Sequence, residues 1–134
     1  NVSTKTIQGY KQLAKTGKLV VITKSMKDVM CLYSLGIPAI APNSETQFVS
    51  DKVLEELKQR FKYIVLLYDN DLTGVRFTNK IRKQHPELIV SMIPRNTGAK
   101  DISDYYRDYG RKATQELIKL TIDKFKRNGI LRSN

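Results

Sequence analysis

The sequence predicts an α/β protein with an open sheet of about four mainly parallel strands flanked by helices. Two observations carry this prediction. Short apolar runs typical of buried strands alternate along the 134 residues with segments in which apolar residues recur at helical spacing. The loops between them are short, and strands that alternate with helices through short loops form βαβ units and hence a parallel sheet.

Four apolar runs have the length and composition of buried strands. They occupy residues 19–22, 37–41, 63–68 and 88–93. The third run, Tyr-Ile-Val-Leu-Leu-Tyr, contains no charged residue, which indicates a strand covered on both faces. We therefore expect this strand in the centre of the sheet.

Helical periodicity fills the segments between these strands. Helices are expected over residues 25–35, 50–60 and 74–84, then over a short segment from 100 to Gly110, and in a last amphipathic helix. Ser25 and Ser50 are suitable N-caps, and Asp28 follows Ser25 at the spacing of a capping box. One face of the first helix is expected to consist of Met26, Val29, Met30 and Tyr33.

The net charge of +11 is distributed unevenly along the chain. We expect a polar, basic segment over residues 1–17, one α/β domain over 18–110, and a basic helix over 111–134 that packs on or flanks it. Residues 1–27 contain six lysines and no acid, whereas residues 107–134 contain eight bases and three acids. Basic ends suit a polyanion such as nucleic acid, because bound phosphates release counterions. Ordinary solvated lysines are the alternative.

Composition also excludes several classes of protein. No apolar run approaches the ~18 residues of a membrane-spanning helix, so we expect no membrane partner. One cysteine, Cys31, and one histidine, His85, do not supply a catalytic triad or a zinc site. A single cysteine favours a reducing compartment, and we expect a cytoplasmic protein. Because the chain begins with Asn1 and not Met, we expect a piece of a longer protein.

The candidate functional site follows the third strand. Asp69 and Asp71 lie directly after this strand, and Gly74 begins the next helical pattern. Ligands of open α/β sheets bind beyond the carboxyl ends of the strands. Two carboxylates at this spacing can turn their oxygens to one point, which suits Mg²⁺ or Mn²⁺. The alternative is an aspartate-rich turn that caps the next helix.

Four stretches of the chain follow one another in an informative order. They are residues 20–28, 35–41, 68–74 and 100–104. In this order they resemble the motifs of the Toprim domain, which bacterial-type primases, type IA and II topoisomerases and some nucleases share. The family's motifs, to which the first, third and last stretches correspond, are a Glu followed by an Asp four residues later, an Asp-x-Asp with a Gly shortly after, and a Lys/Arg-Asp-x-x-Asp/Glu loop. Residues 18–110 look most like the Toprim segments of phage and bacterial primases and primase-helicases.

The resemblance implies Mg²⁺-dependent nucleotidyl transfer in primer synthesis, within a larger primase-type protein of a bacterial cell or phage-infected host. The aspartates that it assigns to metal are Asp69, Asp71, Asp101 and Asp104. The basic residues expected to bind phosphates or nucleic acid are Lys24, Lys27, Arg76, Lys80 and Lys100. The implied partners are template DNA and nucleoside triphosphates, and a replicative helicase is a further candidate.

Lys24 departs from the pattern, because it stands where the family has its glutamate, four residues before Asp28. A charged lysine does not ligate Mg²⁺, although it can hold a phosphate. Glu45, on the loop after the second strand, is a candidate for the missing catalytic carboxylate, and its alternative is a surface acid. Asp101 and Asp104 have helix capping as an alternative that is compatible with a metal role.

Three other functions remain open at this stage. The first is a Toprim-like module that binds nucleic acid or a protein without turnover, which agrees with the lost glutamate. The second is a Toprim nuclease. Residues 69–73 also match the Asp-x-Asp-x-Thr nucleophile loop of haloacid-dehalogenase-like phosphatases. That family normally places this loop on its first strand, whereas two strand–helix units precede it here.

Overall fold

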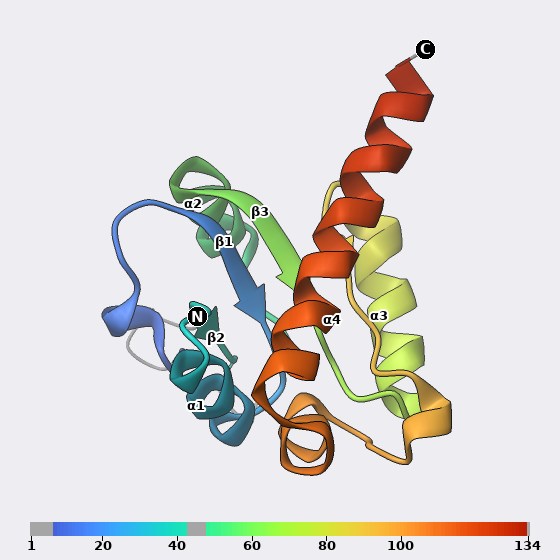
Figure 1. The fold of residues 1–134 in the computed structure, drawn as a ribbon. Coiled ribbons are helices and arrows are strands. Elements are labelled where there is room, and N and C mark those ends of the chain that lie inside the picture. The colour runs from blue at the N-terminus through green and yellow to red at the C-terminus, as the bar shows by residue number, and fades with distance from the viewer. Residues whose placement is uncertain (1–6, 43–47, 134) are drawn as a thin grey trace.

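The computed structural model describes residues 7–42 and 48–133, and over these it confirms an α/β fold (Figure 1). The elements are β1 (Gly17–Ile22), α1 (Met26–Ser34), β2 (Ala39–Ile40), α2 (Asp51–Arg60), β3 (Phe61–Leu66), α3 (Leu72–Gln84), β4 (Ile89–Val90) and α4 (Ile102–Ser133), with short 3-10 helices η2 (Tyr10–Gln12) and η3 (Arg95–Thr97). The described strands form one sheet in the order β2-β1-β3-β4, and every pairing is parallel.

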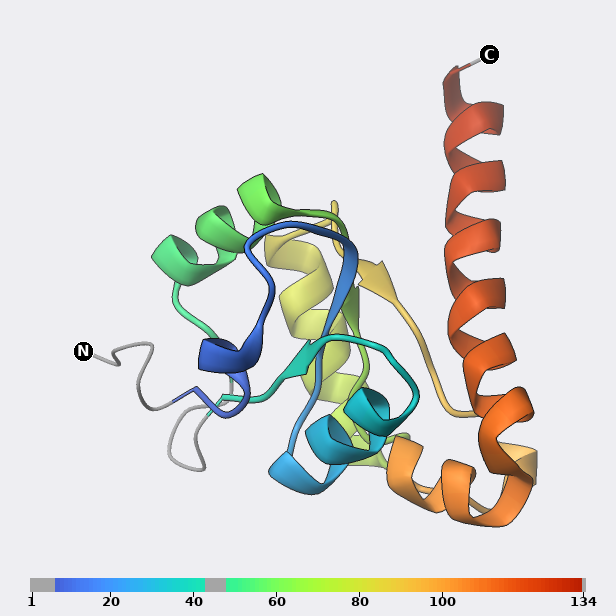
Figure 2. The same ribbon diagram turned by 60° about the vertical axis from the view of Figure 1, so that its left-hand side comes forward.

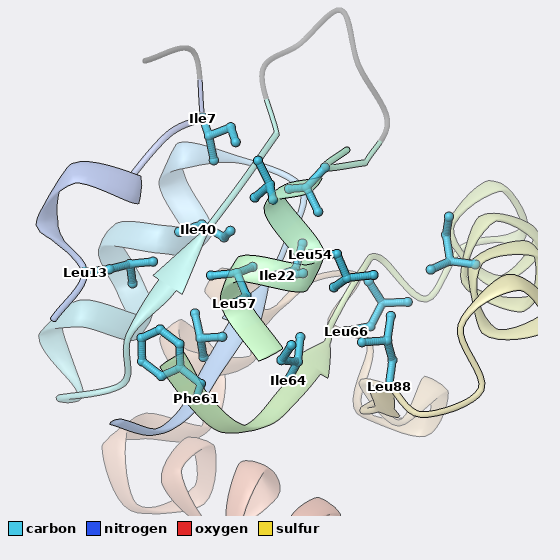
Figure 3. Packing of buried hydrophobic residues seen from close by; sticks show 14 of the residues in the cluster. Ile7, Leu13, Ile22, Ile40, Leu54, Leu57, Phe61, Ile64, Leu66 and Leu88 are labelled. Carbon is cyan, nitrogen blue, oxygen red and sulfur yellow. The ribbon is translucent and has the colours of Figure 1, made fainter. Parts of the chain in front are cut away.

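Helices cover both faces of the sheet. On one face, α2 and α3 pack against alternate residues of the central strands, such as Ile22 and Leu66, in the cluster that Figure 3 shows. On the other face, α1 and α4 pack against the residues between them, Val21 and Val65. Because side chains alternate between the faces of a strand, continuous apolar runs in β1 and β3 supply both cores.

The strand boundaries differ from the predicted ones. β3 begins at Phe61, immediately after α2, so that the sheet pairing starts and ends two residues earlier than residues 63–68. β2 is shorter than 37–41 because Pro38 has no N–H and because Ala41 turns to pair antiparallel with Gln8. β4 is shorter than 88–93 and pairs with β3 at two positions, Ile89 with Val65 and Val90 with Leu66.

The apolar face predicted for α1 is wrong in part. Met26 and Met30 are 36% and 63% exposed, whereas Val29 and Leu32 are fully buried. Asp28 is also buried, at 2% exposure. The helix is turned so that Leu32 packs on the sheet while Asp28 faces α4. In α2, Val53, Leu54 and Leu57 are buried.

The segment before β1 contributes to the core. Ile7 and Leu13 are buried there, which a polar, irregular segment does not predict. Arg60, at the end of α2, holds this segment: its Nε donates to the Lys15 carbonyl at 2.9 Å and its Nη2 to the Ala14 carbonyl at 2.7 Å. Its guanidinium also lies over the Tyr10 ring, 5.5 Å from the centroid. The segment is therefore tied to the domain that follows it.

The last helix contains the break that Gly110 predicts. Residue 110 has φ 88° and ψ −177°, so α4 consists of two helices that meet at a kink, which is visible in orange in Figure 2. Ile118 and Ile122, after the kink, are buried against the sheet. The hydroxyl groups of Ser91, directly after β4, and Thr121, in α4, are hydrogen-bonded at 3.0 Å. Among the described helices, none combines the length and the apolar character that crossing a membrane requires.

Candidate functional site

The loops after β1 and β3 and the start of α4 meet at the carboxyl edge of the sheet. Ile22 and Leu66, the last residues of β1 and β3, are partners in the parallel ladder, so the two loops leave the sheet side by side. The first half of α4 lies beside α1 (Figure 2). Segments that are distant in sequence therefore share one site, where an open α/β sheet binds its ligands.

Three carboxylates gather at this edge. Asp28, Asp69 and Asp101 each offer an oxygen, and these oxygens lie within 4.8 Å of one another. Asp28 and Asp69 are buried, and Asp101 is partly buried. An all-oxygen set of carboxylates is the kind of ligand that Mg²⁺ and Mn²⁺ prefer, so these residues fit the divalent ion that the Toprim resemblance implies.

Asp28 is the residue that sequence reasoning did not assign to the site. Its Oδ1 accepts a hydrogen bond from Ser103 Oγ at 2.6 Å, and its Oδ2 accepts from Ser25 Oγ at 3.1 Å. Burial raises the pKa of Asp28, and the nearby charges of Asp101 and Asp69 add to this, while the serine hydrogen bonds oppose it. Its position four residues after 24 in the motif was the available signal, but Asp28 also lies three residues after Ser25, where its backbone N–H donates to the Ser25 side chain that caps α1.

Asp71 has a different environment from Asp69. It is the N-cap of α3: the Gly74 N–H donates to its Oδ1 at 2.8 Å. Its Oδ2 pairs with Lys100 Nζ at 3.3 Å. The bond from Gly74 and the Lys100 ammonium lower the pKa of Asp71. The capping interpretation thus holds for Asp71, α3 begins before Gly74, and a metal role for Asp71 stays a prediction.

Gly74 permits the close approach of α3 to the acidic loop. A Cβ atom at this position would lie 2.0 Å from the backbone oxygen of Asp69 and 2.8 Å from its carbonyl carbon. Real side chains do not tolerate such distances to backbone atoms. The glycine in the motif is therefore required by packing at the site.

Asn70 joins the acidic loop to the loop before α4. Its side-chain Nδ2 donates to the carbonyls of Ala99 at 2.7 Å and Ile93 at 3.1 Å, and its backbone N–H donates to the Lys100 carbonyl at 2.9 Å. These three bonds place Lys100 and Asp101 opposite Asp69. Sequence reasoning missed Asn70, because the residue between two motif aspartates carries no signal of its own.

Three lysines surround the carboxylates. Lys24 Nζ lies 3.3 Å from Asp69 Oδ2, and Lys27 Nζ lies 3.3 Å from Asp101 Oδ2. Lys100 Nζ pairs with Asp71 and lies 3.9 Å from Asp69 Oδ2. Hydrogen bonds to Asp101 and Asp71 raise the pKa values of Lys27 and Lys100, respectively. The structure therefore brings together three of the predicted phosphate-binding residues.

The remaining predicted residues are not among the three clustered carboxylates, although Asp104 is hydrogen-bonded to one of them. Asp104 accepts from the Lys100 N–H and pairs with Arg107, and its own N–H donates to Asp101. Arg76 and Lys80 are exposed on α3, and within the described residues neither forms an ion pair with the three carboxylates. Glu45 lies outside the described residues.

Cys31 and His85 have no place in the site. Burial raises the pKa of the Cys31 thiol to about 11, with the charges of Asp28 and Asp101 contributing, so the thiol stays protonated. His85 is less exposed than a surface residue, with 18% of its side chain accessible, and it lies near Asp51 and Glu87. Neither residue belongs to the carboxylate cluster.

Comparison with known proteins identifies the family. Residues 21–106 match the family model described as Toprim-like. This chain belongs to the Toprim-like family. The match includes the three carboxylates of the cluster and the position of Lys24. Haloacid-dehalogenase-like phosphatases are a different family, so the Asp-x-Asp-x-Thr pattern of residues 69–73 does not assign this chain to them.

One relative of this Toprim-like domain is a DNA primase. The domain is 26% identical over 117 residues to a DNA primase of Enterococcus faecalis (strain ATCC 700802 / V583), a match that covers 81% of this chain and 18% of the primase. The domain thus spans about a fifth of that relative's length.

Solved primase structures share the fold. The RNA polymerase domain of Mycobacterium tuberculosis primase DnaG matches with a TM-score of 0.61 at 19% identity, over 75% of this chain and 35% of that one. A chain in the structure of bacteriophage T7 lagging-strand DNA polymerase interacting with primase domains of two gp4 subunits matches with a TM-score of 0.58 at 18% identity, over 81% and 56%. At these identities the likeness shows the fold alone.

Proposed function

We propose that this chain is the Toprim domain of a DNA primase-type protein and takes part in Mg²⁺- or Mn²⁺-dependent nucleotidyl transfer during primer synthesis for replication. One observation carries the proposal: Asp28, Asp69 and Asp101 converge at the carboxyl edge of the sheet with lysines around them. Membership of the Toprim-like family and the Enterococcus faecalis DNA primase relative support it.

In this proposal each group of side chains has a distinct task. The three carboxylates hold the divalent ion, which when bound supplies charge stabilisation to the phosphates. Lys24 and Lys100, whose side chains are each 56% exposed, neutralise nucleotide phosphates as point charges. Asn70 and Gly74 keep the two loops at the separation that this requires. Asp71 and Asp104 orient Lys100 and the start of α4.

The proposed partners are template DNA and nucleoside triphosphates, with a replicative helicase as a further partner, in the cytoplasm of a bacterial cell or phage-infected host. The T7 primase domains that share the fold are described as bound to an RNA/DNA hybrid and dTTP. The mycobacterial domain has been solved in complex with double-stranded DNA. The basic residues toward the two ends of this chain agree with contact to a nucleic acid backbone.

Primer synthesis on a single-stranded template by a protein containing this chain tests the proposal. Asp69→Asn and Asp28→Asn should each lower the rate by about a hundredfold or more, because each removes an ion ligand, whereas Asp108→Asn, an exposed acid outside the cluster, should leave it unchanged. Equal rates in all four proteins would remove the catalytic assignment.

A second candidate is a module that binds nucleic acid without turnover, and the Lys24–Asp69 ion pair favours it, because a lysine occupies the family's glutamate position. Salt-dependent DNA binding that survives Asp69→Asn, without primer synthesis by the wild-type protein, would support this candidate. Metal-dependent cleavage of DNA in the same assay would instead indicate a Toprim nuclease.

A further inference from the structure

Lys24 is the part of the site that the family pattern does not explain. Its ammonium Nζ lies 3.3 Å from Oδ2 of Asp69, and Lys100 Nζ lies 3.9 Å from the same oxygen. The Asp69 side chain is only 8% exposed, whereas that of Lys24 is 56% exposed. A buried carboxylate thus faces two ammonium groups, on side chains that are each 56% exposed, and the Lys24 ammonium is the nearer of the two.

The register of the sheet explains why position 24 reaches Asp69. Ile22 and Leu66 are paired, and the Leu67 N–H donates to the Ile22 carbonyl at 2.9 Å. The strands β1 and β3 therefore end side by side, and the loops that follow them bring Lys24 and Asp69 together. A long side chain at position 24 meets the Asp69 carboxylate, so the charge of that side chain acts on Asp69 together with those of Lys100, Asp28 and Asp101.

We propose that the Lys24 ammonium is a built-in cation that holds Asp69 in place of a divalent ion, so that a carboxylate at position 24 would strengthen divalent-ion binding at the cluster. The inference rests on the metal site of the proposed function. The ammonium and a divalent ion compete, because both pair with Asp69 and repel each other at this distance. Since Lys24 is exposed, the competition weakens ion binding without abolishing it.

Mn²⁺ titration of the 134-residue chain by calorimetry, with free Mn²⁺ measured by electron paramagnetic resonance, tests this proposal. Lys24→Gln removes the ammonium, and Lys24→Glu also adds a ligand. The control is Lys52→Glu. Lys52 is exposed on α2, on the face of the sheet opposite α1 and α4, and this substitution changes the net charge by the same amount as Lys24→Glu. The Kd should fall severalfold in Lys24→Gln, by about tenfold or more in Lys24→Glu, and by less than about twofold in Lys52→Glu.

The outcomes separate this inference from the proposed function. Binding by the wild type that Asp28→Asn abolishes, with no gain in Lys24→Glu, overturns the role of Lys24 and retains the metal site. Gains in both Lys24→Gln and Lys24→Glu over a wild type whose binding is too weak to measure support the role of Lys24 and remove metal-dependent catalysis from this chain. Equal gains in Lys24→Glu and Lys52→Glu, or no binding by any protein, overturn the inference. Should Lys24→Glu not fold, Lys24→Gln decides.

Discussion

Three consecutive residues in the loop after β3 have three different structural tasks. Asp69 is buried in the carboxylate cluster, Asn70 holds the loop before α4, and Asp71 caps α3. The sequence predicted that two of these residues act as a pair. They differ because successive side chains of a tight loop point in different directions, and because Gly74 brings the first turn of α3 against Asp69.

Gly74→Ala should disrupt this loop. The added Cβ would lie 2.0 Å from the Asp69 backbone oxygen, so the helix and the loop must separate. We expect a loss of about 1–3 kcal/mol in the free energy of unfolding, measured by urea denaturation, together with weaker Mn²⁺ binding. Gly98→Ala is the control, since that glycine has φ 78° but open space around it, and it should lose stability from backbone strain without the steric clash.

Asp71→Asn should make the stability of the chain less dependent on pH. The pKa of Asp71 is lowered in the folded state by the Gly74 N–H and Lys100, so ionised Asp71 stabilises the fold above its unfolded pKa of about 3.9, and this contribution is lost as pH falls through the lower folded value. Asparagine keeps the cap but not the charge. Urea midpoints of the two proteins should differ at pH 7 and converge toward pH 2, and a constant difference would contradict the assignment.

At the scale of elements, α1 and α4 bring the remaining carboxylates to the site. Asp28 lies in the first turn of α1, and Asp101 directly precedes α4. The hydrogen bond from Ser103 to Asp28 connects these helices across 75 residues of sequence. The first half of α4 can lie against α1 because the kink at Gly110 turns the second half along the sheet (Figure 2).

Gly110→Ala should therefore affect both stability and ion binding. A φ of 88° with ψ −177° belongs to a region that glycine alone occupies freely, so alanine should cost about 1–3 kcal/mol and favour a straighter helix that withdraws Asp101. Thermal unfolding and Mn²⁺ titration measure the two effects. Gly36→Ala, at φ 78° after the far end of α1, should lose stability yet keep its Mn²⁺ affinity. Equal Mn²⁺ affinities in both variants would contradict a role for the kink.

At the scale of the whole molecule, one sheet separates two cores and presents one edge to ligands. α2 and α3 cover one face and α1 and α4 cover the other, so the strands are packed against helices on both sides (Figure 1). The cluster lies beyond the carboxyl ends of these strands. Loops that carry charged side chains are thus held by a buried framework, which is how parallel sheets position the groups of a site.

The sequence by itself determined the α/β class, the parallel sheet, the helix caps at Ser25 and Ser50 and the break at Gly110. Its motif order also made Asp69, Asp71, Asp101, Asp104 and the unusual Lys24 candidates for the site. These features depend on local properties, namely hydrophobic periodicity, capping chemistry and the backbone freedom of glycine. These properties depend on residues that are close together in the sequence, so predicting them requires no knowledge of contacts between distant segments.

Only the tertiary structure decided that Asp28 joins Asp69 and Asp101 while Asp71 caps a helix, and that Met30 faces outward where Leu32 packs inward. The order β2-β1-β3-β4 and the register of β1 with β3 determine which loops meet. Helix orientation depends likewise on what the neighbouring elements bury. Both result from packing between segments far apart in the chain, which a local pattern does not encode.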